Sequence, residues 1–216
     1  MTSDPAAITD PHAHHAPVPP HRSQGWDAAY AGTPAWDIGR PQSAFIAAAE
    51  NGLLRGRSLD IGCGTGETTL LAAAHGADAL GIDVSQRAID LARAKAVDRG
   101  LSARFAVADI VNLDWTGPQF DVTVDSGTFH LFDGNERAAY VGNLRRANRA
   151  GGTLYLLCAR ASASRNWGPP GLSKDDLADA FSDGWAINDI QPSQYEVTDL
   201  APVDSIDAWF ASIMRL

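Results

Sequence analysis

A short apolar stretch that ends in three alternating glycines constrains this chain more than any other feature. It reads Leu59-Asp60-Ile61-Gly62-Cys63-Gly64-Thr65-Gly66-Glu67-Thr68. Glycine has no Cβ, so such a turn can take positive φ angles and let a ligand approach the main chain closely. The unpaired amides of a helix that begins directly afterwards add a weak positive field. The stretch therefore predicts a strand, a ligand-binding turn and a helix in an α/β fold.

The spacing of the glycines separates two kinds of cofactor loop. A dinucleotide-binding loop reads G-x-G-x-x-G, which would place the third glycine at position 67. Here that position holds Glu67, and the third glycine is Gly66. An acidic residue disfavours a pyrophosphate, and Asp60 favours a cationic or hydroxyl-rich ligand. A nicotinamide dehydrogenase is therefore disfavoured, and tight NADH binding would be needed to establish one.

Three further apolar segments end in acidic residues. Segments 79–82, 104–108 and 120–124 are followed by Asp83, Asp109 and Asp125. Asp83 follows the last glycine by about the length of one helix and one strand. Ligands of open α/β sheets bind beyond the carboxyl ends of the strands, so we expect these carboxylates to lie at one site.

The pattern Asp60-x-Gly62-x-Gly64-x-Gly66, with its acid-ended strands, resembles the first motif of the class I S-adenosylmethionine-dependent methyltransferases. The resemblance covers about residues 26–216. It implies S-adenosyl-L-methionine as methyl donor and S-adenosyl-L-homocysteine as product. It also implies a doubly wound, Rossmann-like α/β fold, a seven-stranded mostly parallel sheet with helices on both faces and the last strand inserted antiparallel.

The resemblance also implies roles for the acidic strand ends. A carboxylate at Asp83 accepts the ribose hydroxyls, and one at Asp109 takes the adenine amino group between apolar neighbours. Asp125 is expected as a structural partner at the methionine end rather than as a base, since a sulfonium lowers the pKa of a nearby carboxyl. The residues expected at the cofactor are Trp36, Arg40, Asp60, Gly62, Cys63, Gly64, Gly66, Asp83, Val84, Asp109, Ile110 and Asp125.

The segment 34–41, Pro-Ala-Trp-Asp-Ile-Gly-Arg-Pro, narrows the resemblance. It is similar to the Pro-Trp-Asp-x-Gly-Arg segment of the thiol, halide and thiopurine methyltransferases, and of bacterial relatives that O-methylate small heterocycles and quinone-like toxins. The turn 166–170, Asn-Trp-Gly-Pro-Pro, fits the same group. In that group the tryptophan segment lies over the cofactor as a lid, which implies that Trp36 contacts the methionine end and Arg40 helps to orient it. Simple packing of Trp36 against the sheet is the alternative.

Methyl transfer from a sulfonium is an in-line displacement, in which alignment supplies most of the rate. A hydroxyl or thiol acceptor also benefits from a base within hydrogen-bond reach. His130, beyond the fourth strand, is the candidate catalytic residue, because four of the six histidines lie before residue 22 and His75 lies near a helix end. A packed histidine that donates a hydrogen bond to backbone is an equal alternative. The expected walls of the acceptor pocket are Trp26, Tyr30, Phe132 and Trp167.

The absence of two methyltransferase motifs narrows the chemical class of the methyl acceptor. The Asn/Asp-Pro-Pro-aromatic motif of nucleobase amino methyltransferases does not follow the fourth strand, and segment 160–166 has no acid of the kind that holds Mg²⁺ in catechol-type enzymes. No metal is therefore expected. We expect a small aromatic or heterocyclic acceptor, methylated at a hydroxyl oxygen. The alternatives are a thiol, sulfide or halide acceptor, and a non-catalytic S-adenosylmethionine-binding protein.

Residues 1–25 contain five prolines and four histidines and almost no large apolar side chains, which predicts a disordered tail. A single methyltransferase domain is expected over 26–216, with an N-terminal lid segment at 26–51. Pro192 predicts an edge or a break in the sixth strand. Helices are expected at 45–51, 67–75, 85–99, 135–149 and 175–182, and the last three strands at 152–159, 185–195 and 208–214.

Composition excludes several classes of function. A net charge of −9 without a Lys/Arg run disfavours nucleic acid as a partner. No stretch has the length of a membrane span or a signal peptide. Cys63 and Cys158 form no disulfide framework or metal spacing, which fits the reducing cytoplasm. A monomer and a homodimer are both compatible with the sequence.

Overall fold

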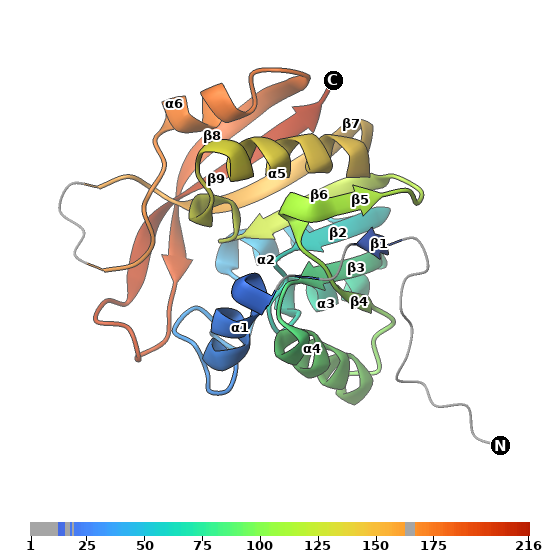
Figure 1. Ribbon diagram of the computed structural model, residues 1–216, viewed down its shortest axis with the longest axis vertical. Helices are drawn as coiled ribbons and strands as arrows, with labels where there is room; N and C mark the ends of the chain where they lie inside the picture. The colour runs from blue at the N-terminus through green and yellow to red at the C-terminus, as the bar shows by residue number, and fades with distance from the viewer. Residues whose placement is uncertain (1–12, 16–17, 19, 163–166) are drawn as a thin grey trace.

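Seven strands form one mostly parallel sheet at the centre of the molecule (Figure 1). The computed structural model describes residues 13–15, 18, 20–162 and 167–216. Across the sheet the strands follow the order β4 (Arg104–Val107), β3 (Asp78–Asp83), β2 (Arg57–Ile61), β6 (Phe120–Ser126), β7 (Asn148–Ala159), β9 (Ser205–Arg215) and β8 (Trp185–Glu196). Only β9 runs antiparallel to its neighbours, between β7 and β8. The predicted fold class is confirmed, including the antiparallel insertion.

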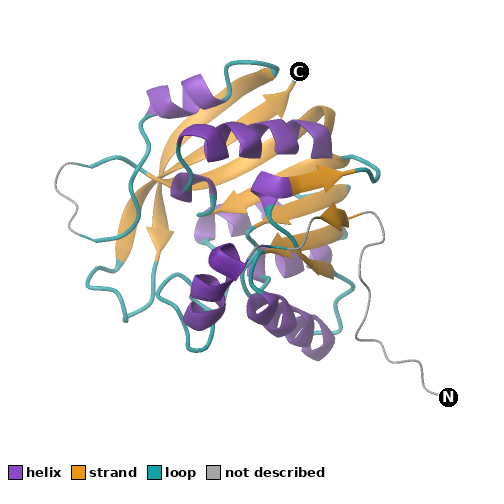
Figure 2. Cartoon of the chain, viewed as in Figure 1, coloured by secondary structure: helices purple, strands orange, loops and turns teal. Residues whose placement is uncertain are grey.

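Helices cover both faces of this sheet, as Figure 2 shows. The described α-helices are α1 (Pro20–Ala29), α2 (Ser43–Glu50), α3 (Glu67–Ala74), α4 (Gln86–Asp98), α5 (Gly134–Ala147) and α6 (Lys174–Ala180). The predicted positions of α2 to α6 are confirmed to within about two residues, and Ser85 caps α4 by accepting a hydrogen bond from the Ala88 amide at 3.1 Å. The predicted extension of α5 to residue 149 is wrong, because β7 begins at Asn148.

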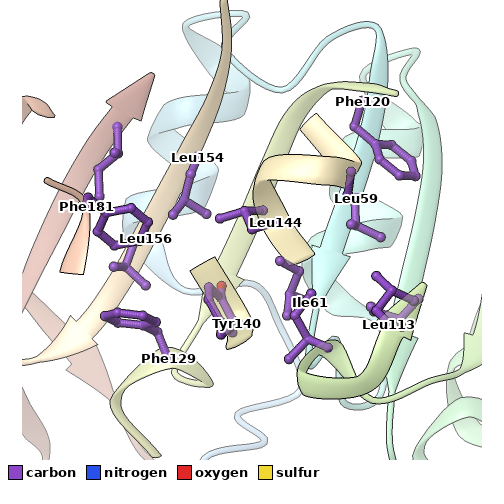
Figure 3. Packing of buried hydrophobic residues seen from close by; sticks show 14 of the residues in the cluster. Leu59, Ile61, Leu113, Phe120, Phe129, Tyr140, Leu144, Leu154, Leu156 and Phe181 are labelled. Carbon is purple, nitrogen blue, oxygen red and sulfur yellow. The ribbon is translucent and has the colours of Figure 1, made fainter. Parts of the chain in front are cut away.

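The largest hydrophobic cluster lies between the sheet and the helices α5 and α6 (Figure 3). Tyr140 and Leu144, one turn apart on α5, are fully buried there, as are Leu154 and Leu156 on β7. Burial of one such side chain contributes about 1.5–3 kcal/mol. This packing fixes β6 and β7 in position, so the loops at their carboxyl ends start from a rigid base.

The N-terminal part differs from the sequence prediction. Helix α1 (Pro20–Ala29) begins before residue 26, and the short strand β1 (Ala13–His15) pairs antiparallel with β5 (Leu113–Trp115). Residues 13–15 and 20–25 of the predicted tail thus form regular elements, and the rest of that tail lies outside the described residues apart from residue 18. Local composition could not reveal this order, because it depends on contacts with segments that lie far away in the chain.

Two smaller observations complete the fold. Pro192 lies in β8, which pairs only with β9, so the prediction of an edge strand is confirmed. Two 3-10 turns, η1 (Ile110–Asn112) and η2 (Phe129–Leu131), follow β4 and β6 at the end of the sheet where the site lies. Among the described residues, no helix is both long and apolar enough to cross a bilayer.

Candidate active site

A cavity of about 670 Å³ opens at the carboxyl ends of β2, β3, β4 and β6. Eleven of the residues expected at the site line it: Trp26, Tyr30, Trp36, Gly62, Asp83, Val84, Asp109, Ile110, His130, Phe132 and Trp167. They come from six separate regions of the chain. The structure thus brings the predicted cofactor residues and the predicted acceptor walls into one cavity.

The glycine loop closes one side of this cavity. Gly62 and Gly64 have φ angles of 63° and 52°, which favour glycine. A Cβ on Gly62 would lie 1.9 Å from Oγ1 of Thr128, and one on Gly64 would lie 2.7 Å from the Tyr30 hydroxyl oxygen. Both positions therefore require glycine for space as well as for conformation.

Gly66 has a different role from the one expected. It lines neither this cavity nor the smaller pocket beside the loop. Its φ is 87°, and a Cβ there would lie 2.8 Å from the Cβ of Ala92 and 2.9 Å from the ring of Phe105. The structure shows a packing role for Gly66, which lets α3 start close to α4 and β4.

Asp83 lies at the end of β3 with its carboxylate held by main-chain amides. Oδ2 accepts from the Gly64 amide at 2.9 Å, and Oδ1 accepts from the Ser85 amide at 2.8 Å. Burial raises the pKa of Asp83 to about 6, against the lowering effect of these bonds. The side chain is thus oriented by the loop whose conformation it supports.

Asp109 is paired with a residue that the sequence did not single out. Its Oδ2 lies 2.6 Å from Nε of Arg22 on α1, and its Oδ1 accepts from the Val111 amide at 3.0 Å. Arg22 also contacts the carboxylate of Glu136 and lies over the ring of Phe132. Its position in a Pro/His-rich segment gave no signal of this role.

A smaller pocket of about 70 Å³ adjoins the large cavity at the glycine loop, and Arg40, Asp60, Cys63 and Gly64 line it. Asp60 is buried and accepts a hydrogen bond from the Thr69 hydroxyl at 2.7 Å. Burial raises its pKa to about 7. Arg40 forms a 2.6 Å ion pair with Glu196. These four predicted residues thus line the smaller pocket and not the large cavity.

Asp125 does not reach either pocket. It is fully buried, and it accepts hydrogen bonds from the amides of Thr128 at 2.8 Å and Phe129 at 3.0 Å and from the Tyr140 hydroxyl at 2.7 Å. These bonds fix the start of η2. The carboxylate thus points into the core, where three donors use it, and it lines neither pocket.

The segment that follows α1 lies against the glycine loop. Trp36 donates from Nε1 to the Tyr30 hydroxyl at 3.1 Å, and its ring meets that of Trp26 edge-on with centroids 5.7 Å apart. The Thr65 hydroxyl donates to Asp37 at 2.9 Å. Three aromatic rings thus cover the cavity beside the loop, where the sequence placed a lid.

His130 lies in η2 and lines the cavity, with 6% of its surface exposed. Its Nδ1 accepts a hydrogen bond from the Ala159 amide at 3.0 Å. At Nδ1 the ring thus accepts a hydrogen bond from backbone. Tyr195 on β8, which the sequence did not single out, lies beside it with ring centroids 6.3 Å apart and donates to the Ser126 carbonyl at 3.3 Å.

The cavity therefore has two chemically different ends. Asp83 and Asp109 lie at one end with apolar neighbours, an arrangement that suits ribose hydroxyls and a purine. The other end combines aromatic rings with His130 and Tyr195. Within the described ranges, no group of three or more His, Cys, Asp and Glu side chains is placed to hold a metal ion.

Comparisons with known proteins agree with this geometry. A family model described as a methyltransferase domain matches residues 59–152. The 2-heptyl-1-hydroxyquinolin-4(1H)-one methyltransferase of Mycobacteroides abscessus is 34% identical over 167 residues, which span 76% of this chain and 74% of that protein. A probable thiol methyltransferase of Arabidopsis thaliana is 27% identical over 72% of this chain and 70% of its own length.

A solved structure is similar to this chain in both sequence and fold. It concerns the conversion of a disulfide bond into a thioacetal group during echinomycin biosynthesis. It is 34% identical, covers 90% of this chain and 92% of its own, and superimposes with a TM-score of 0.81.

Proposed function

Because the chain belongs to the class I S-adenosylmethionine-dependent methyltransferases, we propose that it methylates a small aromatic or heterocyclic acceptor at a hydroxyl oxygen. The observation that carries this proposal is the single cavity of about 670 Å³ that joins the glycine loop and strand-end carboxylates to an aromatic end. Pockets for small molecules span about 300–1,000 Å³. The methyl donor takes part of this space, so the acceptor must be small.

The residues present fit the methyl donor. Gly62 and Gly64 leave main chain where a Cβ could not be placed, and Asp83 and Asp109 offer carboxylates beyond β3 and β4. When bound, S-adenosyl-L-methionine supplies an electrophilic methyl group on a sulfonium. We assign Asp83 to the ribose hydroxyls and Asp109 to the adenine amino group, with Val84 and Ile110 beside the ring.

The acceptor end supports a flat, mostly apolar substrate. Trp26, Phe132 and Trp167 supply aromatic surface in the same cavity as His130, and we assign His130 to a polar atom of the acceptor. The relative from Mycobacteroides abscessus is named for a hydroxyquinolone, which is an acceptor of this kind. Its identity over three quarters of both chains favours the same chemical class here.

Sulfur is the second candidate for the methylated atom. The Arabidopsis thaliana relative is named as a thiol methyltransferase, and the echinomycin structure concerns a disulfide-derived group. The cavity itself is compatible with either atom. Oxygen is favoured because the relative named for a hydroxyquinolone has the higher identity of the two named relatives.

We further propose that the enzyme works in the cytoplasm, as a monomer or a homodimer, and without a nucleic-acid or membrane partner. The two cysteines of the chain, Cys63 and Cys158, are both free, which suits a reducing compartment. The net charge of −9 opposes binding to a phosphate backbone.

The decisive experiment is a screen with methyl-labelled S-adenosylmethionine against phenols, N-hydroxy heterocycles and thiols. Calorimetry first establishes that the methyl donor binds, and product analysis then identifies the methylated atom. Labelled O-methyl products support the proposal. If only thiols are methylated, the methylated atom is sulfur and not oxygen. If the donor binds but no acceptor in these classes is methylated, the proposed substrate class is rejected.

A further inference from the structure

Helix α1 is fixed to the site by two polar side chains, one near each end of the helix. Nε of Arg22 lies 2.6 Å from Oδ2 of Asp109, which follows β4. Asp27 accepts from the Ser85 hydroxyl at 2.6 Å, where α1 lies beside α4 (Figure 1). The Ser85 amide in turn donates to Asp83. Helix α1 therefore joins the two strand ends that we assign to the adenine and the ribose of the methyl donor.

The Asp109 carboxylate is held at both of its oxygens. Oδ1 accepts from the Val111 amide at 3.0 Å, and Oδ2 accepts from the Asn112 side chain at 2.8 Å as well as from Arg22. Val111 and Asn112 belong to η1, so these two bonds are local, and Arg22 is the partner from a distant element. A carboxylate offers about four lone-pair positions. The three bonds thus leave room for a further donor from a ligand.

Arg22 also balances the charge of this carboxylate. The Asp109 side chain is only 2% exposed. A charged group without a partner is costly away from water, and loss of one member of a buried ion pair leaves the other uncompensated. The amino group of adenine can donate a hydrogen bond, but it is neutral and cannot balance the charge. Arg22 therefore supports the contact between Asp109 and the ligand.

The guanidinium of Arg22 is itself held from two further sides. It contacts the carboxylate of Glu136 on α5, and it lies over the ring of Phe132, 5.9 Å from the centroid. The Glu136 side chain is 44% exposed, so water solvates it when Arg22 is removed. Of the two carboxylates that Arg22 contacts, Asp109 is thus the one that depends on the pair.

We propose that Arg22 is a positioning residue for the methyl donor, which holds the Asp109 carboxylate aimed at the adenine amino group. This inference rests on the proposed function, in which Asp109 is assigned to that amino group. A carboxylate accepts from an amino group but opposes the carbonyl oxygen that an inosyl ligand carries at the same ring position. The pair of Arg22 and Asp109 therefore selects adenosyl over inosyl ligands.

Calorimetric titration with S-adenosyl-L-homocysteine and S-inosyl-L-homocysteine tests this selection without an acceptor. We expect the unchanged protein to bind the adenosyl ligand roughly 10- to 150-fold more tightly, as for a hydrogen bond to a charged group. Arg22→Ala should lower this ratio at least about 5-fold, by weakening the adenosyl ligand alone. Both ligands are titrated into the same sample, so an unfolded fraction of the variant does not change the ratio of the two Kd values.

Two further variants separate positioning from attachment of α1. Asp27→Ala removes the other polar contact of the helix and leaves Asp109 untouched, so it should weaken both ligands by the same factor. Arg22→Lys keeps the cation and should recover most of the adenosyl preference. Equal weakening of both ligands in Arg22→Ala would overturn the proposal, because Arg22 would then only attach α1. Equal binding of the two ligands by the unchanged protein would overturn it as well.

The outcome does not depend on the acceptor. If no acceptor in the proposed classes is methylated, the proposed substrate class fails, and the ratio of the two Kd values still decides the role of Arg22. Where an acceptor is methylated, Arg22→Ala should raise the KM for S-adenosyl-L-methionine and leave kcat unchanged at saturating donor, since the lost interaction is made equally in the ground state and the transition state. A lower kcat with an unchanged KM would contradict the proposal.

Discussion

Replacement of Gly62 by alanine tests whether the glycine loop needs space as well as a positive φ angle. Gly62 and Gly76 both have positive φ angles, 63° and 86°. A Cβ at Gly62 would lie 1.9 Å from Oγ1 of Thr128, whereas a Cβ at Gly76 would meet no atom within 4 Å. Gly76→Ala therefore carries the conformational cost alone and is the matched control.

The two costs can be separated from these contacts. An alanine at a left-handed position costs about 1–2 kcal/mol of the free energy of unfolding. Overpacking adds about 1–3 kcal/mol at Gly62. Because 1 kcal/mol shifts the Tm of a chain of this size by about 2–4 °C, we expect Gly76→Ala to lower Tm by about 2–8 °C and Gly62→Ala by about 4–20 °C.

Thermal unfolding without ligand measures the loss of stability. Calorimetric titration with S-adenosylmethionine measures the loss of affinity for the methyl donor. Gly62→Ala should bind the methyl donor at least ~10-fold more weakly, a loss of about 1.4 kcal/mol, while Gly76→Ala should bind it normally. Thr128→Ala in the Gly62→Ala background removes the hydroxyl that clashes, so it should recover part of the lost Tm. Equal behaviour of the two glycine variants would refute the steric argument.

Three further substitutions test the contacts around the site. Asp83→Asn should weaken binding of the methyl donor roughly 10- to 100-fold in calorimetry, because a charged acceptor is lost, whereas Asp78→Asn at the exposed start of the same strand should not. Tyr140→Phe should lower Tm by about 3–12 °C in thermal unfolding, because it removes a buried 2.7 Å bond to Asp125 worth about 1.5–3 kcal/mol. Burial alone would raise the pKa of Glu67, but Lys95 on α4 and Arg99 directly after α4 outweigh it and lower that pKa. The contribution of Glu67 to stability is therefore present above the unfolded value of 4.5 and is lost as pH falls. Urea unfolding of Glu67→Gln should therefore show a smaller loss of stability between neutral and acid pH than the unchanged protein, and an identical loss would contradict this.

Local sequence patterns predicted the sheet because each strand carries its own signal. The glycine loop and the acid-ended strands place Asp83 and Asp109 correctly, since the carboxyl ends of parallel strands meet at one edge. Arg22 and Tyr195 were not predicted, because their roles depend on contacts with residues that lie far away in the chain. Asp125 shows the converse: it ends a strand, yet its side chain points to α5 instead of the cavity. Which way a strand-end side chain turns depends on the donors around it, and the sequence does not show them.

Glu67 shows why the position of a charge is weaker evidence than the spacing of glycines. Its carboxylate forms 2.8 Å ion pairs with Lys95 and Arg99, so the acid that was taken to repel a pyrophosphate is largely neutralised. The spacing argument does not depend on that charge. Gly66 packs against Phe105, which is the close helix–strand contact that the third glycine of a dinucleotide loop makes. Gly66 makes this contact one residue earlier in the motif than the third glycine of a dinucleotide-binding loop, which would stand at position 67. Helix α3 therefore begins one residue earlier, and the turn before it is one residue shorter than a dinucleotide-binding turn.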